Sequence, residues 1–317
     1  MNTSSTSGKK ISIVLPVYNE ALNIELMYNA LCVVIKQLDI VPEFIFVNDG
    51  SDDDSLVILR QLAEKDKNVK VISFTRNFGH QPAITAGLDI ATGDCVVTMD
   101  CDFQDPPEII LLMVEKWLEG KKIIYGRRLL RHDGFFKRIT AKCYYKILYR
   151  ASDIKIMGNI ADFRLIDKSV VNELRLMKEK NRYLRGMVPW LGFSFAIVDY
   201  VRPHRKYGKT GFSLIKMSRF AMAGILNFSL LPRRLGLILG IFIIATGFLF
   251  LLYLAIRFFF DNQFYKLLEW LAVVNYILIG FLFILIWIVA EYISRIYDEV
   301  KGRPLYVIES RINIQPE

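Results

Sequence analysis

The sequence has few of the residues from which zinc sites and disulfide frameworks are built. Its 317 residues include four cysteines and three histidines, and no two cysteines form a Cys-x-x-Cys pair. This pattern argues against zinc modules and fits a reducing compartment. Residues 1–10 are polar and lack an apolar core, so we expect a disordered leader there and no signal peptide.

Two nucleotide-binding signatures are also missing. No Gly-x-Gly-x-x-Gly follows the first apolar segment, and no Gly-x-x-x-x-Gly-Lys-Ser/Thr loop occurs. We therefore expect neither a Rossmann dinucleotide site nor a P-loop. Recognition helices, zinc fingers and RNA-binding signatures are absent as well, so nucleic acid is not an expected partner even though the formal net charge is +9.

Apolar residues are abundant, and their excess lies after residue 234. They make up 53% of the chain, and residues 235–256 and 271–290 are uncharged runs. At about 1.5 Å per residue, a 20-residue helix spans roughly 30 Å and can cross a bilayer. We expect two transmembrane helices within 233–292, after an amphipathic juxtamembrane helix at 212–232. Basic residues on both flanks predict that the N-terminal domain and the tail, 293–317, are cytoplasmic.

In the first 126 residues, short apolar runs alternate with segments of helical periodicity. The predicted strands are 11–16, 44–47, 69–74, 95–99 and 122–126, and the predicted helices between them are 21–38, 55–65 and 81–91. This alternation predicts an α/β domain with a mostly parallel, doubly wound sheet. Polar residues follow the strands at Asn19, Asp49, Arg76 and the pair Asp100/Asp102, so they should meet at the carboxyl edge of the sheet, where ligands bind in such folds.

Asp100 and Asp102 come directly after the strand at 95–99. Two carboxylates so close repel each other unless a cation lies between them, and a hard divalent cation on a diphosphate is one interpretation. The alternative is an acidic surface turn with a helix cap. Cys101, between them, is interpreted as a small filler because a hard cation does not choose sulfur.

Four segments, in order, resemble a known family. They read Val-Leu-Pro-Val-Tyr-Asn-Glu at 14–20, Val-Asn-Asp-Gly-Ser at 47–51, Arg-Asn-Phe-Gly-His at 76–80 and Met-Asp-Cys-Asp-Phe-Gln-Asp-Pro-Pro-Glu at 99–108. The set resembles family-2 glycosyltransferases, in particular the polyprenyl-phosphate sugar transferases similar to bactoprenol glucosyltransferase and dolichol-phosphate mannose synthase. The resemblance extends over most of the chain and implies a GT-A fold, which we place at residues 11–211.

The resemblance also implies roles for individual residues toward a nucleotide-sugar donor. Pro16, Tyr18 and Glu20 would line the nucleoside pocket. Asp49 would contact the base or ribose, and Gln104 would lie near the diphosphate.

The same resemblance implies that Asp100 and Asp102 hold Mg²⁺ or Mn²⁺. Such an ion would stabilise the charge that develops on the leaving diphosphate. Asp162 would be the candidate catalytic base. A lipid phosphate is already largely a dianion at pH 7, since its second pKa is about 6, so orienting Arg164 or a sugar hydroxyl is the alternative role of Asp162.

Basic segments form the expected acceptor side. Residues 135–150 read as a helix with a basic stripe beside an apolar face, either an ordinary surface helix or one at an anionic membrane surface. A basic loop follows an edge strand predicted at 195–201, and its order Gly208-Lys209-Thr210-Gly211 departs from the family's Gly-x-Ser-Lys-like segment. The residues expected to bind the lipid phosphate are Arg127, Arg128, Arg205 and Lys209.

Together these features predict an inverting transferase that moves one sugar to undecaprenyl phosphate at the bacterial inner membrane. Asp162, Asp102 and Arg205 would carry the chemistry. UDP-glucose is the favoured donor, with GDP-mannose, UDP-N-acetylglucosamine and aminoarabinose donors as alternatives, and the family implies a homotetramer.

Two other functions were weighed. A processive polysaccharide synthase is disfavoured, because two spans are too few for a channel and no Gln-x-x-Arg-Trp motif occurs. The alternative from another class is a non-catalytic membrane scaffold that binds a flippase as its partner.

Overall fold

The computed structural model describes residues 8–129, 160–180, 182–201 and 265–314, together with residues 249, 252 and 256. The strands are β1 (Lys10–Val17), β2 (Val41–Asn48), β3 (Val69–Phe74), β4 (Cys95–Thr98), β5 (Ile123–Arg128), β6 (Ile160–Asp167), β7 (Phe195–Tyr200) and β8 (Ile308–Ile312). The helices are α1 (Ala21–Ile35), α2 (Ser55–Lys65), α3 (His80–Ile90), α4 (Ile109–Leu118), α6 (Lys168–Leu176), α7 (Leu184–Trp190) and α10 (Tyr265–Val300).

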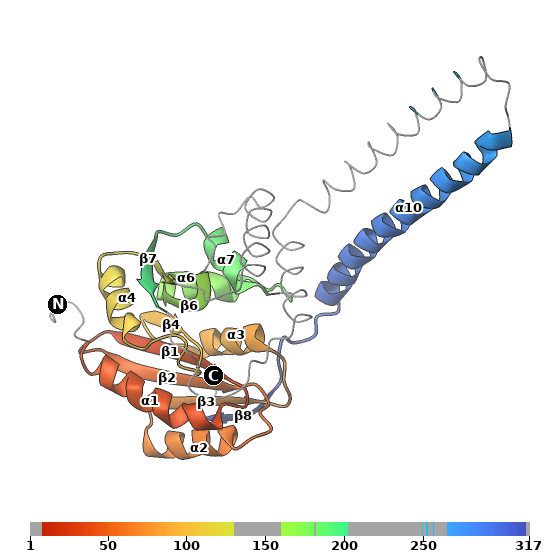
Figure 1. The fold of residues 1–317 in the computed structure, drawn as a ribbon. Coiled ribbons are helices and arrows are strands. Elements are labelled where there is room, and N and C mark those ends of the chain that lie inside the picture. Colours follow the sequence, from red (N-terminus) through yellow and green to blue (C-terminus); the bar gives the residue numbers. More distant parts are fainter. Residues whose placement is uncertain are drawn as a thin grey trace.

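The strands form one eight-stranded sheet in the order β7-β5-β6-β4-β1-β2-β3-β8 (Figure 1). The pairs β1–β2, β2–β3, β1–β4 and β5–β7 are parallel. Strand β6 runs antiparallel between β4 and β5, and β8 runs antiparallel to β3. The predicted mostly parallel α/β sheet is therefore confirmed, with β7 at one edge as expected.

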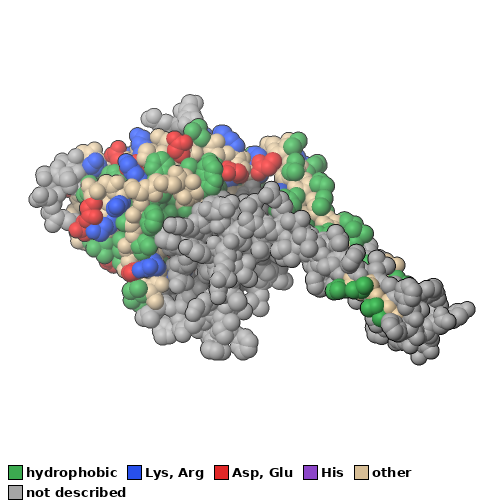
Figure 2. Space-filling view, turned by 90° about the horizontal axis from the view of Figure 1, so that it is seen from above, with side chains coloured by type: hydrophobic (Ala, Val, Ile, Leu, Met, Phe, Trp, Pro, Cys, Tyr) green, Lys and Arg blue, Asp and Glu red, His purple; other side chains and the backbone are tan. Residues whose placement is uncertain are grey.

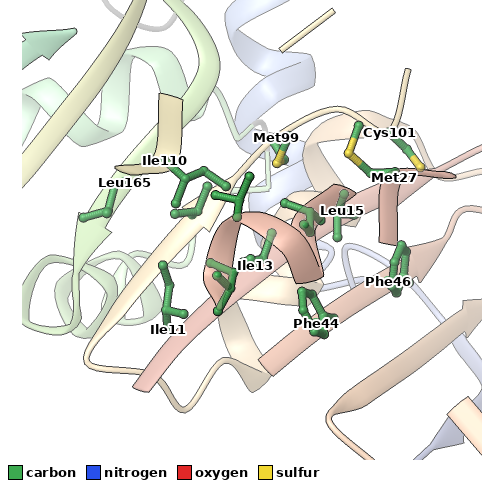
Figure 3. Packing of buried hydrophobic residues seen from close by; sticks show 14 of the residues in the cluster. Ile11, Ile13, Leu15, Met27, Phe44, Phe46, Met99, Cys101, Ile110 and Leu165 are labelled. Atoms are coloured by element: carbon green, nitrogen blue, oxygen red, sulfur yellow. The ribbon is translucent and has the colours of Figure 1, made fainter. Parts of the chain in front are cut away.

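The central strand β1 is buried on both faces, which explains its nearly continuous apolar sequence. Ile11, Ile13 and Leu15 belong to the core beneath α1, α2 and α4, part of which Figure 3 shows. Val14 points to the opposite layer, where α3, α6 and α7 pack. This alternation follows from the two-residue period of a strand.

The end of the chain returns to the sheet, which the sequence analysis did not predict. Strand β8, expected within a separate tail at 293–317, pairs with β3 and forms the second edge of the sheet. Tyr306 stacks on Phe74 with ring centroids 4.9 Å apart, and its hydroxyl donates to Asp89 over 2.8 Å. The amide of Asn313 donates to the carbonyl oxygens of Ala63 and Val69. These contacts make the last described residues part of the α/β domain.

Helix α10 extends away from the sheet (Figure 1) and precedes β8 in the chain. Apolar side chains are exposed along it (Figure 2), including Leu282, Ile286 and Val289. Of the helices that the structure describes, none combines the length and the apolarity needed to cross a membrane.

Several expected segments lie wholly or mostly outside the described residues. They are the leader up to residue 7, the basic helix at 135–150, the juxtamembrane helix at 212–232 and most of the run at 235–256. Strand β1 begins at Lys10, inside the stretch that the sequence analysis assigned to the leader.

Candidate active site

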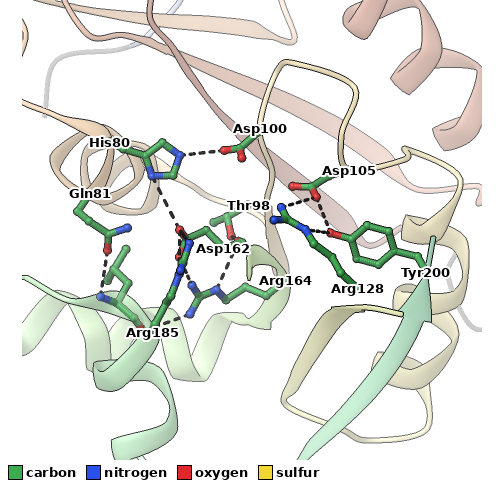
Figure 4. Close-up of polar contacts among 11 residues, drawn as sticks. His80, Gln81, Thr98, Asp100, Asp105, Arg128, Asp162, Arg164, Arg185 and Tyr200 are labelled. Carbon is green, nitrogen blue, oxygen red and sulfur yellow. Dashed lines mark hydrogen bonds and ion pairs between the residues drawn. The ribbon is translucent and has the colours of Figure 1, made fainter. Parts of the chain in front are cut away.

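The polar residues that follow the parallel strands converge at the carboxyl edge of the sheet. Asp49 follows β2, His80 begins α3 after β3, and Asp100 follows β4. Hydrogen bonds link these segments, and Asp162 from β6 lies beside them (Figure 4). This is the arrangement expected from parallel strand ends.

Asp49 supports the loop that leads to His80. Its buried carboxylate accepts hydrogen bonds from the backbone amides of Phe78, at 2.7 Å, and Gly79, at 2.9 Å. Burial raises the pKa of Asp49, while these amides act in the opposite direction. Both carboxylate oxygens thus hold protein amides in this structure, and the contact of Asp49 with the base or ribose stays a prediction.

The next residue, Gly50, allows the 47–51 and 76–80 segments to touch. Its φ is +63°, and a Cβ atom at this position would lie 2.4 Å from the carbonyl carbon of Arg76. A side chain could be accommodated only if the backbone moved. The two motifs found in the sequence are therefore one packed unit.

Pro16, Tyr18 and Glu20 lie at the carboxyl end of β1, next to the 47–51 segment. The Tyr18 side chain is exposed. The backbone amides of Asn19 and Glu20 donate to the hydroxyls of Ser51 and Ser55. The three residues are thus placed together at the sheet edge, and their role in binding a nucleoside stays a prediction.

Residues 100–105, called the metal loop below, connect β4 to the turn before α4. Asp100 Oδ1 lies 2.8 Å from Nε2 of His80. Asp102 is 8% exposed, and its Oδ1 accepts the backbone amide of Gln104 at 3.0 Å. Phe103, between them, has a left-handed backbone with φ +61°.

The metal loop offers the hard oxygen ligands that Mg²⁺ and Mn²⁺ prefer. In the part of the chain that the structure describes, no group of three or more His, Cys, Asp or Glu side chains is arranged to hold a metal ion. Two carboxylates together with diphosphate and water oxygens are a ligand set that such a cation can take.

Asp162 is enclosed by cationic side chains. Its carboxylate is 2.6 Å from Nη2 of Arg164 and 2.8 Å from Nη2 of Arg185, and Nδ1 of His80 is 3.9 Å away. Burial opposes ionisation, but the two guanidinium groups outweigh it and hold the pKa of Asp162 well below its usual range. The group therefore stays a carboxylate at neutral pH and is a weak base.

Two side chains hold the first turn of α7, which carries Arg185. Gln81 accepts the backbone amide of Leu184 at 3.0 Å, and Nη1 of Arg164 donates to the Leu184 carbonyl at 3.1 Å. The sequence analysis missed Arg185, because it is a single basic residue in a short helix, belongs to no motif and lies 23 positions after Asp162.

His80 also lacked an assigned role in the sequence analysis. Partial burial opposes its protonation, but the carboxylates of Asp100 and Asp162 raise the pKa of His80 to about 9. The imidazole thus links Asp100 of the metal loop to Asp162 and its two arginines, which we call the Asp162 group. Alternating carboxylates and cations therefore extend from the end of β4 through α3 to β6 and α7.

The arginines expected at the acceptor phosphate are paired with carboxylates. Arg127 makes a two-point contact with Asp199, at 2.6 and 2.8 Å. Arg128 donates to Asp105 and to the hydroxyl of Tyr200. Their contact with a lipid phosphate stays a prediction. The same holds for Arg205 and Lys209, which lie outside the described residues.

Comparisons with known proteins agree with this arrangement. The family model for glycosyl transferase family 2 matches residues 12–175. A Bacillus subtilis (strain 168) protein named uncharacterized glycosyltransferase YkcC is 44% identical over 308 residues, covering 96% of this chain and 94% of that protein. The bactoprenol glucosyl transferase of Shigella phage SfX is 38% identical over 304 residues, covering 95% and 99%.

Among solved structures, a glucosyl-3-phosphoglycerate synthase from Mycobacterium tuberculosis in complex with Mn²⁺, UDP and phosphoglyceric acid gives a TM-score of 0.49. It is 20% identical, over 71% of this chain and 78% of that chain, a likeness too slight to carry a functional argument. The mostly parallel α/β sheet and the family match give the GT-A type of fold that the motifs imply. The chain is a glycosyltransferase and belongs to glycosyltransferase family 2.

Proposed function

We propose that the chain transfers one sugar from a nucleotide-sugar to a polyprenyl phosphate, with inversion at the anomeric carbon. The observation that carries the proposal is the carboxylate pair Asp100 and Asp102 at the end of β4, beside the Asp162 group. Relatives named bactoprenol glucosyl transferase, similar over nearly the whole chain, support the lipid acceptor.

In the proposed reaction an oxygen of the lipid phosphate attacks the anomeric carbon, and the bond from that carbon to the nucleoside diphosphate breaks. A bound divalent metal supplies positive charge to the leaving diphosphate. Asp100 and Asp102 hold this metal. Pro16, Tyr18 and Glu20 hold the nucleoside.

Asp162 acts in this proposal by holding cations in place. A lipid phosphate needs no strong base at neutral pH, since its second pKa is about 6. The low pKa of Asp162 fits that requirement, because the carboxylate holds Arg185 beside itself and His80 next to the metal loop without taking a proton.

The acceptor side combines basic residues with a membrane anchor. Arg205 and Lys209, with Arg127, neutralise the lipid phosphate, whereas Arg128 is engaged by Asp105 and Tyr200. Residues 235–256 and 271–290 anchor the protein in the bacterial inner membrane, with the catalytic domain in the cytoplasm. Two observations support the anchor: both runs are uncharged, and α10 exposes apolar side chains to its surroundings. A homotetramer is part of the proposal.

The favoured donor is UDP-glucose. The relatives named bactoprenol glucosyl transferase support glucose as the sugar. GDP-mannose, UDP-N-acetylglucosamine and aminoarabinose donors are the alternatives to be tested beside it.

The test is sugar transfer by the purified full-length chain in detergent. Undecaprenyl phosphate is supplied with Mg²⁺ or Mn²⁺ and a panel of radiolabelled UDP- and GDP-sugars. We expect label from one donor to enter the organic phase, and Asp102→Asn or EDTA to abolish the transfer. The matched control is Asp39→Asn. Asp39 is exposed and lies in the turn before β2, at the amino ends of the strands and away from the site.

Two results would contradict the proposal. Transfer that survives both Asp102→Asn and EDTA would refute the metal role of the pair. Nucleotide binding without a lipid-linked product from any donor would favour a non-catalytic scaffold.

A further inference from the structure

The metal loop is held by side-chain contacts at both of its ends. At the first end, Asp100 pairs with His80. At the other end, Asp105 is 1% exposed and bonds to two residues of neighbouring strands. Between these ends Asp102 accepts the amide of Gln104, and Phe103 has a left-handed backbone. A non-glycine residue keeps this conformation only where its surroundings enforce it.

The second end forms a closed group of three side chains, which we call the Asp105 clasp: Asp105, Arg128 and Tyr200 (Figure 4). The Tyr200 hydroxyl donates to Asp105 Oδ1 at 2.5 Å, and Nη2 of Arg128 donates to the same oxygen at 3.1 Å. Nε of Arg128 donates to the Tyr200 hydroxyl at 3.0 Å. The carboxylate and the guanidinium balance each other's charge, as buried ionised groups require.

The two strands that supply the clasp are in register. Arg128 ends β5 and Tyr200 ends β7, and the two residues are direct partners in this parallel pair. The clasp thus fastens the metal loop to two strand ends. Each strand leads into a basic segment that we assign to the acceptor side, after residue 129 and after residue 201.

Core packing sets the position of the Tyr200 hydroxyl. The ring is 3% exposed and packs edge-on against Phe163, with centroids 5.5 Å apart and an interplanar angle of 84°. Gly126 makes room for it, because a Cβ atom there would lie 3.0 Å from Cε1 of Tyr200. Because this packing fixes the ring, the hydroxyl is held beside Asp105.

We propose that the Asp105 clasp positions the metal loop for binding a metal–nucleoside diphosphate, which makes Tyr200 and Arg128 positioning residues. This inference rests on the proposed function for the identity of the ligand. The clasp holds Asp105 two residues after Phe103 and so keeps the strained turn that presents Asp102 and Gln104. It also gives Arg128 a role different from contact with the lipid phosphate.

Nucleotide binding tests the clasp without any turnover. We would measure the dissociation constants of UDP and GDP by calorimetry, with and without Mn²⁺, on the full-length chain in detergent. Tyr200→Phe keeps the seated ring and removes only the hydroxyl. We expect its Mn²⁺-dependent binding to weaken about tenfold, because a buried carboxylate loses a charge-assisted hydrogen bond. Binding without Mn²⁺ should change less than threefold.

A matched control separates positioning from general damage. Tyr125→Phe removes the hydroxyl of another buried tyrosine of the same sheet, one that packs in the opposite core layer. We expect this variant to bind as the wild type does. Arg128→Lys, which keeps the charge and loses the guanidinium fork, should weaken Mn²⁺-dependent binding in the same direction as Tyr200→Phe.

The outcomes divide cleanly. Unchanged Mn²⁺-dependent binding in Tyr200→Phe, or equal losses in Tyr200→Phe and Tyr125→Phe, would overturn the clasp. An Arg128→Lys variant that raises only the KM for undecaprenyl phosphate would also overturn it. If the wild type binds Mn²⁺ and nucleotide but transfers no sugar, the proposed function fails, and the binding data on the variants still decide for or against the clasp.

Discussion

Glu43 offers a quantitative test of the fold. It lies near the amino end of β2, whereas the candidate site lies at the carboxyl ends of the strands. Its side chain is 2% exposed and forms ion pairs with Lys70, at 2.6 Å, and Lys10, at 2.9 Å. The Ser12 hydroxyl and the backbone amide of Thr92 also donate to its carboxylate. Burial acts to raise the pKa, but these four partners lower the pKa of Glu43 from 4.5 to about 2.

The difference between these two pKa values gives the expected energy. At about 1.4 kcal/mol for each pKa unit, it corresponds to roughly 3 kcal/mol of folding free energy. The pKa is lower in the folded state, so this stabilisation is complete above about pH 5 and is lost as the pH falls toward about 2. Glu43→Gln should remove it and leave two lysines without a buried partner.

Thermal unfolding followed by tryptophan fluorescence would measure the loss on the full-length chain in detergent. At pH 7 we expect the midpoint of Glu43→Gln to fall by about 6–12 °C, since a domain of this size loses about 2–4 °C for each kcal/mol. Between pH 5 and 3 the midpoint of the wild type should fall as Glu43 becomes protonated, and the midpoint of the variant should fall less. Glu64→Gln, an exposed glutamate on α2, is the control. Equal midpoints for Glu43→Gln and wild type at pH 7 would refute the reasoning.

Three further predictions follow from other contacts. Gly50→Ala should lower the thermal midpoint and weaken nucleotide binding, because its Cβ would overlap the backbone of Arg76 at a positive φ that costs about 1–3 kcal/mol; an unchanged melt would contradict the close packing. Asp162→Asn should lower kcat and move any limb of the kcat–pH profile that belongs to His80 to lower pH, because Asp162 helps to hold the pKa of His80 at about 9. Asp162 should contribute no acid limb of its own, since its pKa lies well below the neutral range; loss of an acid limb would instead indicate a catalytic base. Tyr306→Ala should destabilise the domain by about 0.5–1.5 kcal/mol through the lost stacking on Phe74, and hydrogen exchange of the β3 amides would detect it.

The sequence predicted the parallel part of the sheet and the placement of the residues at its edge. The reason is geometric: in parallel strands every carboxyl end lies on the same side, so Asp49 and Asp100 must be close if each strand is identified. The apolar runs identify β1 to β4 well, because a strand buried on both faces leaves few polar positions.

The direction of β6 and the partners of Asp162 could not be read from the sequence. An apolar run contains no information about whether it lies parallel or antiparallel to its neighbours. Arg185 reaches Asp162 only because α7 packs beside β6, and Tyr200 meets Arg128 only because β7 pairs with β5. These contacts depend on tertiary packing, which the spacing of residues along the sequence does not reveal.

Strand β8 was missed for a similar reason. Its sequence, Ile-Glu-Ser-Arg-Ile at 308–312, has apolar residues only at its two ends, so neither an apolar run nor a two-residue period indicates a strand. What makes it a strand is the free edge of β3.

The late position of β8 has a consequence for biosynthesis. Ser73 on β3 and Glu309 on β8 face each other at 3.5 Å although 236 positions separate them in the chain. At about 5–20 residues per second, a ribosome needs roughly 10–50 s to make that stretch. Throughout this time β3 presents an unpaired apolar edge to other nascent chains, which is a known route to aggregation. The sheet that begins with β1 is therefore complete only after β8 has been made. Conditions that slow elongation should lower the yield of folded enzyme.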